Sequence, residues 1–99
     1  MSIKHKSYEE VMAEPLPNSK DFGYDGDYDE FDRSEGYYRW QIAMCEWSIR
    51  RHEAELERHG GGESEYAAYV RRSSASAIRY ERDLIAKYTD RIDSMKGAA

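Results

Sequence analysis

Carboxylate side chains crowd one short stretch of the chain, between residues 21 and 35. This stretch holds seven Asp or Glu residues and a single Arg, and aromatic residues stand between the acids. Carboxylates spaced along a surface can imitate the phosphates that DNA- and RNA-binding proteins recognise with Lys and Arg. Aromatic rings among them add apolar anchoring. The pattern predicts a decoy for a basic groove, and the alternative is a solvated acidic linker.

The residues predicted to bind a partner lie in and beside this stretch. They are Asp25, Asp27, Asp29, Glu30, Asp32 and Glu35, together with Tyr24 and Tyr28. Residues 1–36 carry ten acids and four cations, whereas residues 37–99 carry ten acids and eleven cations. Because nucleic-acid-binding domains are usually strongly basic, a net charge of −5 argues against direct binding of nucleic acid. The expected partner is instead a basic protein that itself binds nucleic acid.

No residue pattern predicts catalysis or a bound metal. The alternating acids from Asp25 to Asp29 match the opening of a calcium-binding EF-hand loop, but Glu30 stands where that loop needs glycine. A zinc-protease helix beginning at His52 would need a second histidine at the position of Leu56. We therefore expect no enzymatic activity, no catalytic residues, no metal and no cofactor.

Two long helices are predicted to present the acidic stretch. Apolar residues recur at helical spacing over about 33–59 and about 64–95, and three glycines at residues 60–62 separate these segments. Two long helices joined by so short a turn must lie antiparallel. The predicted fold class is all-α: an antiparallel two-helix hairpin over residues 34–97, preceded by an acidic, Tyr-rich arm over residues 1–33.

The arm is expected to contain one short helix, near residues 7–14. Ser7 and Glu10 fit a capping box, and two prolines follow the helix and end it. Residues 18–31 are interpreted as extended or irregular, because two glycines and several Asp residues disfavour helix. Disordered segments usually lack aromatic residues, so this aromatic-rich arm is expected to dock onto its own body or onto a partner.

The first long helix is expected to begin near residues 32–34, where Asp32 and Glu35 form a capping-box pattern, and it carries two apolar faces. One partner helix can cover only one of these faces. The second face is bulkiest near the arm, where it consists of Tyr37, Trp40, Met44 and Trp47. We predict that this patch either holds the arm or mediates oligomerisation, because a body of about 60 residues often gains stability by self-association.

A single cysteine and the absence of a bilayer-spanning apolar run predict a cytoplasmic protein without membrane contacts. Being short, acidic, helical and free of catalytic motifs, the chain resembles small phage-encoded inhibitors of host machinery, including anti-CRISPR and other DNA-mimic proteins. That resemblance of general character implies inhibition, by protein–protein contact, of a nucleic-acid-binding host protein in the host cytoplasm. The alternative function is a structural or assembly protein, a helical hairpin that oligomerises or docks in a larger particle.

Overall fold

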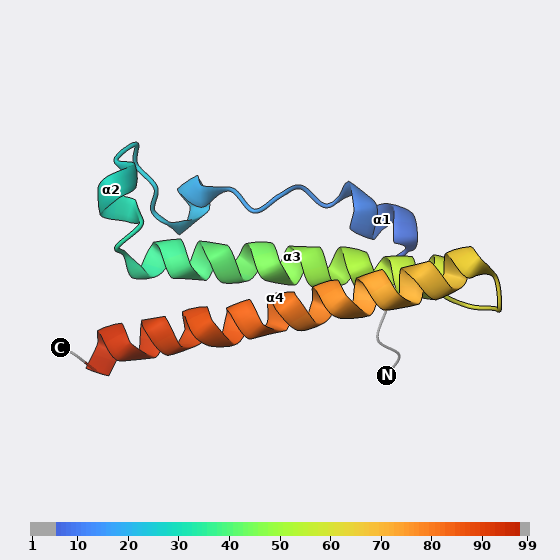
Figure 1. Cartoon of the computed structure of the whole chain (residues 1–99). Helices are drawn as coiled ribbons and strands as arrows, with labels where there is room; N and C mark the ends of the chain where they lie inside the picture. The colour runs from blue at the N-terminus through green and yellow to red at the C-terminus, as the bar shows by residue number, and fades with distance from the viewer. Residues whose placement is uncertain (1–5, 98–99) are drawn as a thin grey trace, which may run out of the picture.

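The computed structural model describes residues 6–97 and confirms an all-α fold built on a helical hairpin (Figure 1). The elements, in chain order, are α1 (Tyr8–Ala13), the 3₁₀ helix η1 (Ser19–Phe22), α2 (Tyr28–Phe31), α3 (Glu35–His59) and α4 (Glu65–Gly97). Figure 1 shows α3 and α4 packed side by side, with the arm running along another side of α3. The helix α3 is therefore the central layer, between the arm and α4.

Side-chain caps set where the two long helices begin. The hydroxyl oxygen of Ser34 accepts a hydrogen bond from the backbone N–H of Tyr37 at 3.3 Å, so α3 begins at Glu35. The start therefore lies near the end of the expected range of residues 32–34, but the cap is Ser34 and not Asp32, because Asp32 ends α2. At the other long helix, the Ser64 hydroxyl accepts from the N–H of Ala67 at 3.0 Å. Both caps satisfy amide groups that the first helical turn leaves without a partner.

Ring contacts at both ends fix the antiparallel register of the hairpin. Tyr38 packs against Tyr88 with ring centroids 6.0 Å apart near the arm, and His59 packs against Tyr66 at 5.8 Å beside the glycine turn. The buried side of α4 consists of Ala67, Val70, Ser74, Ile78 and Ile92. Most of these side chains are small or medium-sized, which lets the backbones of α3 and α4 approach closely.

Residues 18–31 are not the irregular segment that their composition suggested. The side chain of Asn18 accepts from the N–H of Lys20 at 3.0 Å and starts η1, and Asp27 accepts from the N–H of Glu30 at 3.1 Å and starts α2. Asn and Asp are poor inside helices because their side chains bind nearby backbone amides, and the same property makes them good caps. Asp27, one of the Asp residues expected to disfavour helix, thus begins a helical turn, and Asn18 begins another.

The arm approaches α3 so closely that residue 36 must be glycine. A Cβ atom added to Gly36 would overlap the backbone carbonyl oxygen of Phe22, at the end of η1. Glycine inside a helix costs about 1 kcal/mol relative to alanine. Glycine is nevertheless needed at this position, because the backbone of the arm packs directly against the backbone of α3 there.

Gly36→Ala is expected to lift η1 from α3 while the hairpin stays helical. Alanine would strengthen an isolated helix, but its methyl group needs the space that the carbonyl of Phe22 occupies. A red shift of tryptophan emission with unchanged far-UV circular dichroism would report the displaced arm, because Trp40 and Trp47 both contact it. The control is Gly61→Ala, since a Cβ atom there meets open space. A Gly36→Ala protein with unshifted emission and higher thermal stability would contradict the close approach.

Candidate functional site

The patch predicted on the second face of α3 lies against the arm. The indole Nε1–H of Trp40 donates to the carbonyl oxygen of Pro17, and that of Trp47 donates to the carbonyl oxygen of Glu14, each at 2.9 Å. All four members of the predicted patch, Tyr37, Trp40, Met44 and Trp47, are half-buried. The two tryptophans therefore bind the backbone near the two ends of the proline-containing segment that joins α1 to η1.

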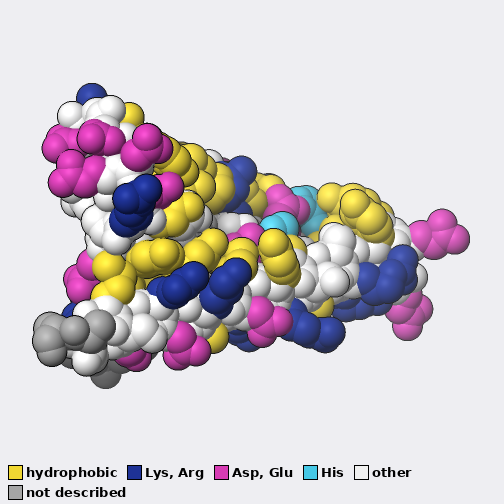
Figure 2. All heavy atoms as spheres, turned by 60° about the vertical axis from the view of Figure 1, so that its left-hand side comes forward, with side chains coloured by type: hydrophobic (Ala, Val, Ile, Leu, Met, Phe, Trp, Pro, Cys, Tyr) yellow, Lys and Arg dark blue, Asp and Glu magenta, His cyan; other side chains and the backbone are white. Residues whose placement is uncertain are grey.

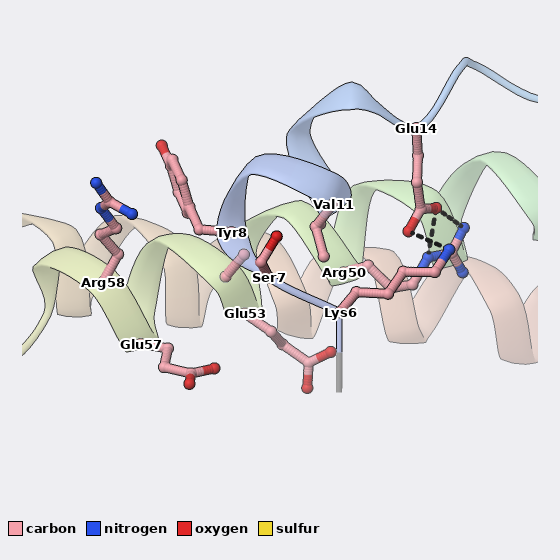
Figure 3. A pocket seen from close by; sticks show the side chains of 10 residues that line it. Lys6, Ser7, Tyr8, Val11, Glu14, Arg50, Glu53, Glu57 and Arg58 are labelled. Atoms are coloured by element: carbon pink, nitrogen blue, oxygen red, sulfur yellow. Dashed lines mark hydrogen bonds and ion pairs between the residues drawn. The ribbon is translucent and has the colours of Figure 1, made fainter. Parts of the chain in front are cut away.

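A groove of about 520 Å³ lies between α1 and α3, and Figure 3 shows its charged lining. Lys6 and Arg50 both contact the carboxylate of Glu14, at 3.1 and 3.0 Å. The hydrogen bond from Lys6, with that from Arg50 after it, lowers the pKa of the Glu14 carboxyl. The pair with Arg50 joins the arm to α3, whereas the pair with Lys6 lies within the arm.

A ring stack ties α1 to the glycine end of the hairpin. The ring of His59 meets the edges of Tyr8 and Tyr66, with both centroid distances 5.8 Å. The Tyr8 hydroxyl donates to Glu55 at 2.6 Å, and this hydrogen bond raises the pKa of Tyr8. The guanidinium of Arg58 lies 4.7 Å from the centre of the Tyr8 ring. His59 thus has a packing role, and no three His, Cys, Asp or Glu side chains in residues 6–97 are placed to hold a metal ion.

The acids predicted to bind a partner separate into two groups. Four are exposed on the loop before α2 and in α2 itself, and these form the acidic tip: Asp25, Asp27, Asp29 and Glu30. Figure 2 shows acidic side chains gathered at one end of the molecule. The other two do not belong to this exposed surface, because Asp32 is half-buried and Glu35 forms an ion pair with Arg39 at 2.6 Å.

The acidic tip is a shaped turn. Gly26 has a φ of +111°, a conformation that side-chain-bearing residues rarely adopt, and it reverses the chain between two Asp residues. The carboxylate of Asp25 accepts from the N–H of Asp27 at 3.2 Å, and Asp27 in turn caps α2. Phe31, at the end of α2, is only 4% exposed and anchors the turn to the body.

The aromatic residues near the tip face mainly inward, around Phe31. Tyr24, Tyr37 and Trp40 surround its ring at centroid distances of 5.4, 5.7 and 5.9 Å. Tyr24, predicted to contact a partner, is thus half-buried in this cluster. Tyr28 packs edge-on against Tyr37 at 6.4 Å but remains 52% exposed, so its ring is available beside the acids.

The carboxylates of the acidic tip lie outside the ion pairs that residues 6–97 form. Those pairs involve Glu9, Glu14 and Glu35, bound to cations of the arm and α3. The tip carries four acids and no cation within six consecutive residues, 25–30. Its negative charge is therefore presented to solvent without neutralisation by these pairs.

Sequence reasoning placed Trp40 and Trp47 in a patch that could hold the arm, but it missed Arg51 as a donor to the arm. Arg51 donates to the carbonyl oxygen of Met12 at 3.0 Å, and its guanidinium lies 4.6 Å from the centre of the Trp47 ring. Chemical reasoning could have predicted such hydrogen bonds. A half-buried indole needs an acceptor for its N–H, and the backbone of an extended segment has carbonyl groups without helical partners. Which carbonyls meet which indoles depends on the path of the arm, which periodicity does not encode.

The single thiol is poorly suited to nucleophilic chemistry. Cys45 is buried between α3 and α4, and burial, together with a hydrogen bond to Glu81, raises its pKa to about 12. Thiolate is the nucleophilic form, so this side chain stays protonated near neutral pH. Its environment is that of a packed core residue.

Comparison with protein families, curated proteins and solved structures finds no match to this chain. None of the helices in residues 6–97 contains an apolar stretch of membrane-spanning length. The geometry of the arm and of the acidic tip is accordingly the basis on which a function can be argued.

Acidification is expected to detach the arm before it melts the hairpin. The docked arm holds the pKa of Glu14 below its ordinary value of 4.5. Its contribution to docking is therefore complete above that value and is lost as the pH falls through the docked-state pKa. Tryptophan emission should shift to the red as the pH falls below 4.5, ahead of the loss of far-UV ellipticity.

Glu14→Gln provides the control for this titration. It removes the carboxylate that Lys6 and Arg50 share, so the arm should be looser at neutral pH and the acid-induced shift should be smaller. Coincident loss of emission and ellipticity, identical in both proteins, would mean that this carboxylate does not govern docking.

Proposed function

We propose that the chain is a small binding protein whose acidic tip occupies a basic, nucleic-acid-binding site on a partner protein. One observation chiefly supports the proposal: the four tip carboxylates are exposed, held on a capped turn and outside the ion pairs formed in residues 6–97. A site that binds phosphates with Lys and Arg is complementary to such an array.

A fixed array has an advantage over a flexible acidic tail. Binding a flexible tail orders its backbone and side chains, and this ordering reduces the free energy of binding. Here the cap at Asp27 and the buried ring of Phe31 impose that order before binding. The exposed ring of Tyr28 adds an apolar contact next to the charges, and Tyr is enriched among residues that dominate binding energy.

In this proposal the chain competes with DNA or RNA for the basic site. It would then inhibit its partner as DNA mimics do, and the phage-encoded anti-defence inhibitors that it resembles, anti-CRISPR proteins among them, provide a setting for such a role. The long-range attraction of the charges would speed association and would weaken as salt is added.

A structural or assembly role is the second candidate. The route predicted from the sequence was association through the second face of α3. The indole groups of Trp40 and Trp47 on that face already bind the carbonyls of Pro17 and Glu14, so association there requires release of the arm. This observation favours the binding role over assembly through α3.

Neutralising the acidic tip is expected to abolish partner binding without unfolding the arm. The variant carries Asp25→Asn, Asp27→Asn, Asp29→Asn and Glu30→Gln. Asparagine at position 27 can still cap α2, so the turn is preserved while four charges are lost. The immobilised variant, incubated with nuclease-treated extract of native host cells, should retain nucleic-acid-binding proteins at least about tenfold less than wild type, as expected when several charge contacts are lost.

A matched control removes four exposed acids elsewhere: Glu57→Gln, Glu63→Gln, Asp90→Asn and Asp93→Asn. This control has the same net charge as the tip variant and should bind the partner like wild type. An added DNA duplex should displace the partner from the control and from wild type. Equal retention by the tip variant, or a captured protein that DNA fails to displace, would refute the proposed function.

A further inference from the structure

The helix α4 has a second face that the hairpin leaves open. One stripe of exposed residues, here called the outer stripe, recurs at helical spacing: Glu65, Arg72, Ser76, Tyr80, Asp83 and Lys87. Tyr69, on the same side, is 59% exposed, and Tyr80 is 61% exposed. The ion pairs formed in residues 6–97 join residues of the arm and α3 and include no α4 residue. The charges of the outer stripe are thus available for another molecule.

If a second copy of α4 lies antiparallel to the first, the charges of its outer stripe fall opposite charges of the other sign. Glu65 lies eleven residues before Ser76, and Lys87 lies eleven residues after it. Arg72 lies four residues before Ser76, and on reversal it falls opposite Tyr80, next to Asp83. An antiparallel copy of the same helix therefore places acid opposite base and arginine opposite aromatic ring.

We propose that a second copy of this chain docks antiparallel along the outer stripe, with a two-fold axis at Ser76. Glu65 pairs with the partner's Lys87, and Arg72 lies between the partner's Tyr80 and the partner's Asp83. Because the interface is two-fold symmetric, every one of these contacts occurs twice. Arg and Tyr are also the residue types that interfaces select, since both combine wide contact surfaces with polar groups.

The arrangement of the stripe favours this occupant and this orientation. Arg72 and Asp83 lie eleven residues apart, about 16 Å along one helix, so they cannot pair within a single chain. A parallel copy in register would instead set Glu65 against the partner's Glu65 and Lys87 against the partner's Lys87. Small side chains at Ser76 and the neighbouring Ser73 allow two helices to approach at the centre of the stripe.

This dimer leaves the acidic tip free. The arm packs on α3, whereas the outer stripe belongs to the exposed side of α4. A dimer would present two acidic tips, and engagement of two sites on one target would increase the apparent affinity. The inference itself does not depend on the proposed function, because association can be measured without a partner.

A charge exchange between Arg72 and Asp83 tests the pairing. Arg72→Asp alone and Asp83→Arg alone each set like charges together across the interface, so each should weaken dimerisation in sedimentation experiments by about tenfold or more. The double variant restores opposite charges and should recover most of the wild-type affinity. Since the two positions are too far apart to interact within one helix, recovery specifically indicates antiparallel pairing between copies.

A cysteine on the proposed axis gives a second, independent measurement. Ser76→Cys places two thiols together in the dimer, so mild oxidation should link the chains rapidly. Ala75→Cys is the control, because that exposed neighbour points about 100° further round the helix. The native Cys45 is buried and should contribute little to either product.

The proposal is overturned by a wild-type chain that stays monomeric at high concentration. It is also overturned by a double variant no better than the single ones, or by equal cross-linking at positions 75 and 76. Association that survives all of these substitutions would place the interface elsewhere and would count equally against the outer stripe.

Discussion

The structure depends on two indole N–H groups that bind backbone carbonyls of the arm. Trp40 and Trp47 are two turns apart on α3, and each donates at 2.9 Å to the segment that joins α1 to η1. The hairpin alone would leave this bulky face in water. The arm also supplies Val11 and Phe31, two of the few well-buried apolar side chains in residues 6–97. The acidic arm is therefore packed against α3 as part of the folded body.

The docked arm also determines what the acidic tip can be. The chain is held on α3 at η1, where Phe22 touches Gly36, and again where the ring of Phe31 is buried among its neighbours. Between these two anchors the backbone must turn outward and back, and Gly26 with a φ of +111° makes the reversal. The charged side chains project from this turn because the aromatic ones are used to hold it. The alternation of acidic and aromatic residues thus serves two purposes: the aromatic residues anchor the turn, and the acidic residues face solvent.

Features encoded over short distances were predictable from the sequence, and those set by the path of the arm were not. The glycine turn and the helical periodicity identified the hairpin, and Ser7 with Glu10 forms the expected capping box. The spacing of Asp32 and Glu35 also fits a capping box, but Ser34 was the better placed cap, and Glu35 engages Arg39 instead. The Asp residues of the arm were counted as unfavourable for helix, although Asp27 starts a short helical turn. The helix propensity of a residue type says whether it is favourable inside a helix. Its position relative to the helix decides whether it begins or ends that helix.

The distribution of ion pairs shows why unneutralised charge is tolerated at the tip. The pairs in residues 6–97 all lie on or beside the α3 layer, and those of Arg39 and Arg58 are largely exposed. Exposed pairs typically contribute about 0–1 kcal/mol, so the pair of Arg58 with Glu9 adds little to the hold on the arm, and the pair of Arg39 with Glu35 lies within α3. The buried ring of Phe31, the indole hydrogen bonds and the less exposed pair of Arg50 with Glu14 hold the arm, and none of them depends on the charge of the tip. A chain stabilised in this way can keep four adjacent acids in solvent, since their mutual repulsion acts on a turn that other interactions already hold.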